Sequence, residues 1–104
     1  MATIKSTDET FDTLVKENKI IIFDFWAPWC GPCMGIATAL EEITNENPEW
    51  KIAKHNIDDE PNQPTVMGVR GIPTMIMFKD GKQVSTKVGA VPKSSIISWI
   101  KKSI

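Results

Sequence analysis

The sequence predicts an α/β fold with one mixed β-sheet and helices on both of its faces. Apolar, β-branched runs alternate along the chain with segments whose apolar residues recur every three or four positions. The strand–helix–strand order of the first half predicts parallel pairing through a right-handed crossover. Near the C-terminus, an Asp80-Gly81 turn between two strand-like runs is typical of an antiparallel hairpin.

Length and composition suit one domain over residues 1–104. Hydrophobic residues make up 41% and charged residues 24% of the chain, close to average globular usage. A chain of this size can bury an adequate core without disulfide staples. The formal net charge of -1 gives no electrostatic basis for binding nucleic acid or an anionic membrane.

The first residues indicate a cytoplasmic protein. They lack the apolar segment of a signal peptide, and the longest apolar stretch, 20–23, is too short to span a bilayer. In a reducing compartment, a close cysteine pair is more often catalytic or metal-binding than structural.

The N-terminal part is expected to contain two strands and a helix. Residues 2–5 are a candidate first strand. Ser6 and Glu9 have the spacing of a capping box, which predicts a short helix from Ser6 to about Lys16. The nearly continuous apolar run 20–26 is typical of a central strand that is covered on both faces.

The later elements follow from the same two periodicities and from proline and glycine positions. We expect a helix from near Cys33 to Pro48, a strand over 51–57, a short helix from Pro61, strands over 74–78 and 83–88, and a last helix from Pro92.

Two cysteines lie where the central strand ends and its helix begins. Cys30 and Cys33 are three residues apart, so on a helical turn they are close enough to form a disulfide. The positive end of the helix dipole stabilises a thiolate there. Pro32 suits a first helical turn, and Gly31 keeps side-chain bulk away from the sulfurs. The hypothesis is that Cys30 attacks a substrate disulfide and that the shielded Cys33 resolves the mixed disulfide.

Two other readings of the cysteine pair are weaker. A zinc site needs two further ligands, and the chain has one histidine and no other cysteine. A structural disulfide that closes so short a loop would add little stability. The position of the pair at a strand-to-helix junction therefore favours redox catalysis.

Asp24 interrupts the apolar central strand, where an unpaired carboxylate is costly. We interpret it as a buried proton acceptor for Cys33, because burial favours the protonated form and places its proton exchange near neutral pH. The alternative is a polar residue that is merely tolerated near the end of a strand.

The sequence resembles the thioredoxin family across essentially its whole length, in family order and at family spacing. The segments that carry the resemblance are Phe23 to Cys33, Asn56 to Asp58, Val69 to Thr74, Phe78 to Gly81 and Val88 to Ala90. The resemblance implies the thioredoxin fold, a five-stranded mixed sheet flanked by four helices, and general reduction of protein disulfides.

The resemblance also implies partners and cofactors. A monomer is expected to act on oxidised substrate proteins and to be recharged by a thioredoxin reductase. It is expected to bind no cofactor itself, because NADPH and FAD belong to the reductase. In keeping with this, the sequence has no G-x-G-x-x-G motif for a dinucleotide.

Further site residues are carried over from the resemblance. The Ile72-Pro73 bond corresponds to a cis-proline site packed against the cysteines, where the backbone at Ile72 can pair with an extended substrate. The apolar residues expected to bind substrate around the cysteines, which we call the rim, are Trp29, Met67, Ile72, Gly89 and Ala90. Lys54 is expected near Asp24. The alternatives are a trans proline at Pro73, a core position for Trp29 and a solvated Lys54.

Several residues depart from the family pattern. Met34 replaces a lysine, so the Cys30 thiol is expected to be less acidic, unless the change is a neutral surface swap. Thr38 replaces a proline and Gly35 is unusual, so the helix is expected to be straighter or looser in its first turns. His55 replaces an apolar residue. We expect a hydrogen-bonded structural histidine rather than a catalytic or pH-sensing one.

Three rival functions remain open on the sequence alone. The first is a disulfide oxidase or isomerase of the same fold in an oxidising compartment. The second is a module that docks a partner protein and whose redox activity is incidental. The third is a zinc-linked dimer.

Overall fold

A computed structural model describes residues 2–104; Met1, the first residue of the expected domain, lies outside the described residues. These residues form five strands and four helices, which alternate along the chain except where the fifth strand directly follows the fourth. They are β1 (Ile4–Ser6), α1 (Phe11–Glu17), β2 (Ile20–Trp26), α2 (Gly31–Glu46), β3 (Lys51–Asn56), α3 (Asn62–Val66), β4 (Thr74–Lys79), β5 (Lys82–Val88) and α4 (Lys93–Ser103).

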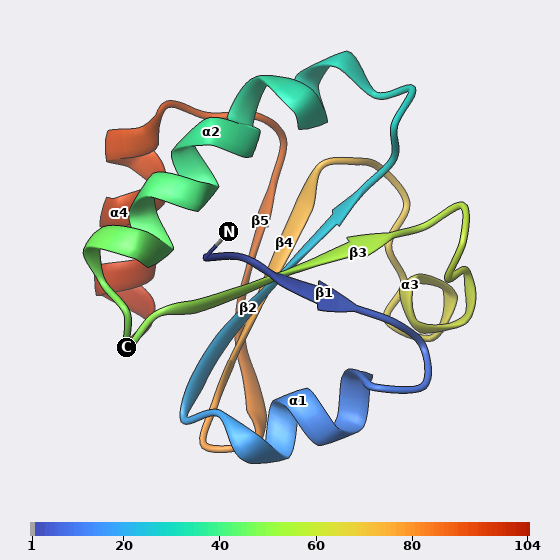
Figure 1. Cartoon of the computed structure of the whole chain (residues 1–104), viewed down its shortest axis with the longest axis horizontal. Helices are drawn as coiled ribbons and strands as arrows, with labels where there is room; N and C mark the ends of the chain where they lie inside the picture. Colours follow the sequence, from blue (N-terminus) through green and yellow to red (C-terminus); the bar gives the residue numbers. More distant parts are fainter. Residues whose placement is uncertain (1) are drawn as a thin grey trace.

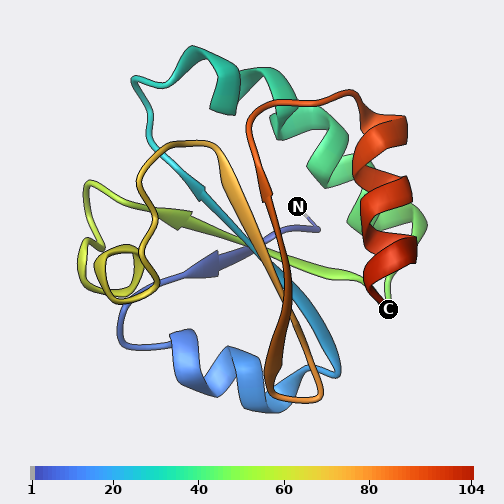
Figure 2. The ribbon, with the colours of Figure 1, turned by 180° about the vertical axis from the view of Figure 1, so that it is seen from behind.

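The strands form one mixed sheet in the order β1-β3-β2-β4-β5. β1, β3 and β2 pair in parallel, whereas β4 is antiparallel to both β2 and β5. α2 and α4 lie on one side of the sheet, and α1 and α3 lie on the other (Figures 1 and 2). This arrangement confirms the predicted α/β fold and places the expected cysteine helix, α2, directly against the sheet.

Central strand β2 is covered on both faces, as its apolar run predicts. Ile22 packs with apolar residues of α2 and α4, while Phe23 and Phe25 pack with α1 on the opposite face. There the rings of Phe11 and Phe23 stack with centroids 4.0 Å apart. Each fully buried side chain of this size contributes about 2 kcal/mol to stability. The two cores therefore hold β2, and the loop that follows it, in a fixed place.

The β4–β5 hairpin has the predicted Asp-Gly turn. Asp80 and Gly81 have φ angles of 52° and 82°. Two successive positive φ angles match the right-handed twist of the strands, and they explain the choice of aspartate and glycine.

The predicted capping box at Ser6 is wrong, and α1 starts about one turn later than expected. Ser6 is the last residue of β1, so the first strand is also shifted from 2–5 to Ile4–Ser6. The reciprocal bonds are instead made by Thr7 and Thr10: each backbone N–H donates to the other's Oγ1, at 3.0 and 3.1 Å. The buried Ser6 hydroxyl bonds to His55, so tertiary structure overrides the local pattern.

None of the helices described here is long and apolar enough to cross a membrane.

Candidate active site

Cys30 and Cys33 form a disulfide at the start of α2, with their Cα atoms 5.3 Å apart. Cys30 is the N-cap residue, and its Sγ accepts a hydrogen bond from the Cys33 N–H at 3.2 Å. Pro32 lies in the first turn, where its missing N–H leaves no bond unmade. A Cβ on Gly31 would meet no atom within 4 Å, beyond its chain neighbours, so packing does not demand glycine there.

Both sulfur residues are largely shielded. Cys30 is 5% exposed and Cys33 is 1% exposed, which is the order expected for an attacking and a resolving cysteine. Cys30 Sγ lies 3.9 Å from the carbonyl oxygen of Ile72. Because a disulfide has no S–H donor, this is a contact and not a hydrogen bond. The Ile72 backbone therefore borders Cys30.

The Ile72-Pro73 peptide bond is cis, as the family resemblance implies, and not trans. The Pro73 carbonyl accepts a hydrogen bond from the Gly89 N–H at 2.8 Å. This bond brings Gly89 and its neighbour Ala90 to the Pro73 end of β4. This hydrogen bond therefore connects two segments that are distant in the sequence and that both contain expected rim residues: Ile72-Pro73 and Gly89-Ala90.

Trp29 is 69% exposed, so it is not a core residue. Its indole Nε1–H donates to Asp58 Oδ2 at 2.9 Å, which fixes the ring to the segment after β3. Trp29 and Ile72 both line a hollow of about 360 Å³. Asp58 was not expected to orient the tryptophan.

Met67 lies apart from this hollow. It lines a second one with Gly71 and Val88, and it packs toward the α1 side of the sheet. The structure therefore places Trp29 and Ile72 at one hollow and Gly89 beside Pro73, whereas Met67 lines a different hollow.

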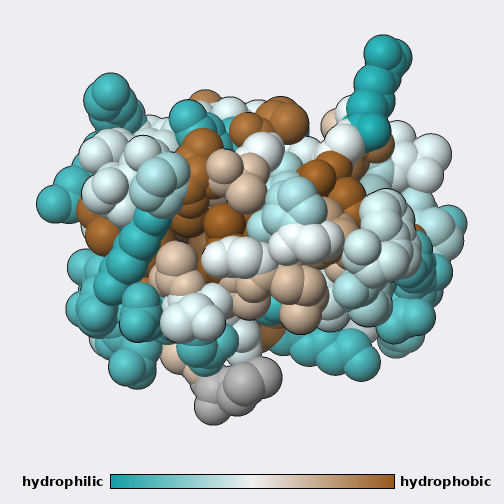
Figure 3. Space-filling model, turned by 90° about the horizontal axis from the view of Figure 1, so that it is seen from above, coloured by the Kyte–Doolittle hydropathy of each residue, from teal (hydrophilic) through white to brown (hydrophobic). Residues whose placement is uncertain are grey.

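Apolar side chains gather in the middle of the face seen in Figure 3, and hydrophilic ones surround them. The exposed large apolar residues of the described chain include Trp29, Met34, Val66 and Val88. Isolated apolar residues are common on protein surfaces, but Trp29 and Met34 directly flank the cysteine pair in the sequence, and exposed apolar groups beside a reactive disulfide suit an apolar partner segment.

Asp24 is fully buried in β2. It shares the face of Ile22, because side chains alternate along a strand, and so it faces the α2 side. Neither carboxyl oxygen has a hydrogen-bond partner among residues 2–104. Burial raises the pKa of Asp24 from 3.8 to about 7, although the positive charge of Lys54 lowers it in part. The carboxyl group can therefore take up and release a proton near neutral pH.

Lys54 lies opposite Asp24 on the neighbouring parallel strand β3, so the expected proximity is present. Its Nζ lies 4.3 Å from the centre of the Trp26 ring, within the range of a cation–π contact. Lys54 and Trp26 also line a groove of about 440 Å³ at the β1 edge of the sheet. Solvent therefore reaches the sheet beside the buried carboxyl group.

His55 is fully buried and hydrogen-bonded, as expected for a structural histidine. Its Nδ1 lies 2.9 Å from Ser6 Oγ, and its Nε2 lies 2.9 Å from the Glu60 carbonyl oxygen. Nε2 is also 3.2 Å from Asp8 Oδ1. The sequence did not predict these contacts. Asp8 is far from both His55 and Glu60 along the chain, and Glu60 contacts His55 through its backbone carbonyl, which any residue type would supply.

α2 runs without interruption from Gly31 to Glu46, so neither Gly35 nor Thr38 breaks it. Within residues 2–104, no three histidine, cysteine, aspartate or glutamate side chains are grouped closely enough to hold a metal ion.

The thioredoxin family model matches residues 2–102. The chain belongs to the thioredoxin family. A thioredoxin of Acidithiobacillus ferridurans is 46% identical over 96 residues, which cover 90% of this chain and 89% of that protein. The thioredoxin of Rickettsia felis is 44% identical, with 94% of this chain and 95% of that protein covered. A solved mutant thioredoxin from Halobacterium salinarum is 29% identical, with a TM-score of 0.89 and coverage of 97% of this chain and 89% of that one.

Family membership explains the chemistry of the site. Thioredoxin-family proteins carry no bound cofactor and work through a redox-active disulfide, here Cys30–Cys33. The chain is thus a protein-disulfide oxidoreductase that exchanges its own dithiol with the disulfides of other proteins.

Proposed function

We propose that this chain is a general reductant of protein disulfides in the cytoplasm. It acts as a monomer of one domain and is recharged by a thioredoxin reductase that holds the NADPH and FAD. The position of Cys30 carries the proposal: this residue lies at the N-cap of α2, beside the Ile72 backbone, with the more deeply buried Cys33 behind it.

The first step is attack by the Cys30 thiolate on one sulfur of a substrate disulfide. The substrate S–S bond breaks, a mixed disulfide forms, and one substrate thiolate leaves. The Cys33 N–H that points at Cys30 Sγ and the positive end of α2 stabilise the attacking thiolate. The substrate lies as an extended segment along Ile72 and Pro73, against Trp29, Gly89 and Ala90, with Met67 at the outer edge.

The second step releases the reduced product. Cys33 passes its proton to Asp24 and attacks Cys30 Sγ, which forms the Cys30–Cys33 disulfide and expels the second substrate thiolate. Two electrons have then moved from the dithiol to the substrate. The pKa of about 7 for Asp24 supports this role. Lys54 lies close enough for its positive charge to lower this pKa in part. The reductase returns two electrons to the disulfide.

Two single variants test the division of labour between the cysteines. With Cys33→Ser we expect a stable mixed disulfide with an oxidised substrate protein, and with Cys30→Ser we expect none. The converse result would reverse the assignment of the two roles.

Coupled insulin reduction with a thioredoxin reductase and NADPH tests the reductant role. Steady NADPH oxidation that requires both cysteines is expected. A reduction potential well above those of cytoplasmic reductants would indicate an oxidase or isomerase instead. Retained biological activity in a variant that lacks both cysteines would indicate a docking module.

A further inference from the structure

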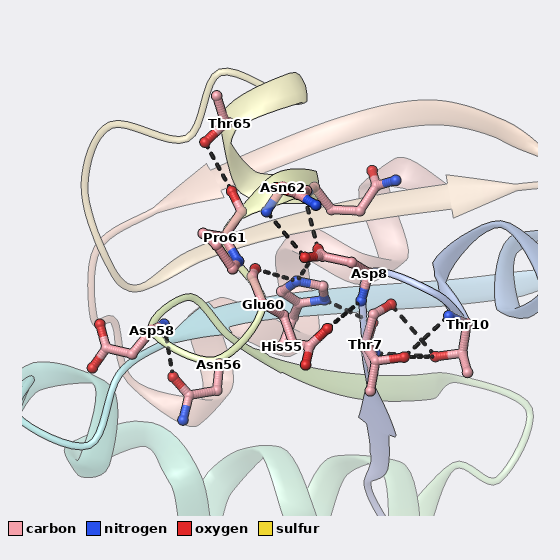
Figure 4. A network of polar contacts seen from close by, with 12 residues as sticks. Thr7, Asp8, Thr10, His55, Asn56, Asp58, Glu60, Pro61, Asn62 and Thr65 are labelled. Atoms are coloured by element: carbon pink, nitrogen blue, oxygen red, sulfur yellow. Dashed lines mark hydrogen bonds and ion pairs between the residues drawn. The ribbon is translucent and has the colours of Figure 1, made fainter.

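A chain of hydrogen bonds connects His55, on the sheet, to α3 (Figure 4). The Asp8 carboxylate lies at its centre. Asp8 Oδ1 accepts from the Gln63 N–H at 2.9 Å, and Oδ2 accepts from the Asn62 N–H at 3.1 Å. Asp8 thus caps the first turn of α3 from a segment that is more than 50 residues away in the sequence.

His55 holds the Asp8 carboxylate in this position through a contact of 3.2 Å between His55 Nε2 and Asp8 Oδ1. Both partners of its Nε2, the Glu60 carbonyl and Asp8 Oδ1, are acceptors, so Nε2 carries the proton. The Asp8 backbone N–H in turn donates to Glu60 Oε1 at 2.8 Å. Burial tends to raise the pKa of Asp8, but the amides of Gln63 and Asn62, together with His55, lower it overall. Asp8 is therefore an ionised acceptor with a fixed orientation.

The same network continues from α3 toward the cysteines. The Gln63 carbonyl accepts from the Met67 N–H at 2.9 Å, and the Pro64 carbonyl accepts from the Val69 N–H at 2.9 Å. Pro64 is buried, and it lines the same hollow as Trp29 and Ile72. The 67–72 segment that begins at these bonds ends at Ile72, whose carbonyl borders Cys30 Sγ.

We propose that Asp8, oriented by His55, is a positioning residue for substrate binding: it anchors α3 and thereby holds the 67–72 segment in place beside Cys30. The proposal rests on the proposed function, because it concerns how that function's protein substrates are bound. A helix as short as α3 has little stability of its own, so an external cap decides whether its first turn is held.

The test compares Asp8→Ala with Glu9→Ala, a change of the neighbouring exposed residue, which makes no side-chain hydrogen bond among the described residues. With insulin as substrate, Asp8→Ala should raise KM about tenfold with little change in kcat. Its reduced form should react with a small aromatic disulfide, dithiobis(nitrobenzoate), at the parent rate, because that reagent does not need the 67–72 segment. Equal losses with both substrates, or an unchanged KM, would overturn the proposal.

Amide hydrogen exchange gives a readout that does not depend on activity. In Asp8→Ala, the amides of Met67 and Val69 should exchange about tenfold faster or more, while those of central strand β2 keep the parent rate. Unchanged exchange at Met67 and Val69 would also overturn the proposal. If the parent protein failed to reduce insulin, the proposed function would fall, but this measurement would still test the anchor.

Two further variants cover the case in which Asp8→Ala does not fold. Asp8→Asn retains one acceptor, the amide oxygen Oδ1, for the Gln63 N–H, so its KM should lie between those of the parent and Asp8→Ala. His55→Leu should raise KM in the same direction, and a double-mutant cycle with Asp8→Asn should show that the two effects are not additive. Additive effects would show that His55 does not act through Asp8.

Discussion

Asp24 and Lys54 lie directly opposite each other on parallel strands, yet they form no ion pair within 4.0 Å among the described residues; Lys54 instead lies over the Trp26 ring. The lysine charge is near enough to lower the pKa of the carboxyl group, but it does not offset burial. The site thus retains a carboxyl group that is partly protonated at neutral pH.

We expect Asp24→Asn to stabilise the oxidised protein above neutral pH but not in acid. The folded pKa is raised from 3.8 to about 7, so the folded state binds more protons than the unfolded state between these values. The stability of the parent protein therefore falls as pH rises through this window. A shift of this size corresponds to at most about 4 kcal/mol above the window.

Urea unfolding at about pH 4 and about pH 8.5 checks this prediction. The difference between parent and variant should be near zero at the lower pH and largest at the higher one. Asp12→Asn, at an exposed position in α1, is the control. An equal difference at both values would show that the titration of Asp24 is not the cause.

The same Asp24→Asn variant should slow the second chemical step more than the first. Formation of the mixed disulfide needs only the Cys30 thiolate, whereas its resolution needs Cys33 to lose a proton. We expect resolution to fall by about a hundredfold near pH 7, which is typical for the loss of a general base. Rapid-mixing kinetics with a labelled peptide disulfide separates the two steps, and equal slowing of both would contradict the role.

Gly35→Ala should stabilise α2 by about 0.5–1 kcal/mol. Gly35 lies on an exposed part of the helix, and an added Cβ would meet no atom within 4 Å. Gly68→Ala is the matched control: the space there is equally open, but its φ of +72° strains an alanine. Urea unfolding should move in opposite directions for the two variants, and a gain at Gly68 would refute the backbone argument.

Met34→Lys should speed the alkylation of Cys30 in the reduced protein. Met34 is half exposed, and it follows Cys33 in the first turns of α2, so a lysine there adds positive charge near the thiolate. We expect a rate increase of about two- to fivefold with iodoacetamide at low salt, with a smaller increase at about 1 M salt.

Thr38→Lys, at an exposed position one turn further along α2, controls for net charge. It should have a smaller effect than Met34→Lys. Equal rates for the parent protein and Met34→Lys would mean that the methionine is a neutral surface substitution.

The sequence predicts those parts of the site that depend on short-range patterns. The strand-to-helix junction at Cys30, the cis bond at Pro73 and the burial of Asp24 follow from local spacing, from the family resemblance and from one charge in an apolar run. Their surroundings are specified by neighbours in the sequence, so a pattern can reveal them.

One prediction failed and two contacts were not predicted, and all three involve partners that are distant in the sequence. Ser6 has the spacing of a helix cap, but it is bonded to His55 across the sheet. Asp8 caps a helix other than the one that follows it, and Trp29 is held by Asp58. Hydrogen bonds of this kind form between residues that only the folded structure brings together. Short-range sequence patterns therefore cannot predict them.

The two edge strands of the sheet, β1 and β5, affect whether copies of this chain can associate in concentrated solution. β1 has only three residues, and β5 carries Lys82 and Lys87 and pairs with β4 through an irregular register near Phe78. Short, charged or irregular edge strands are poor templates for strand addition by another chain. Because the proposed substrate site exposes apolar groups, such edges are an advantage: they make it harder for copies of this chain to add strands to one another and form fibrils.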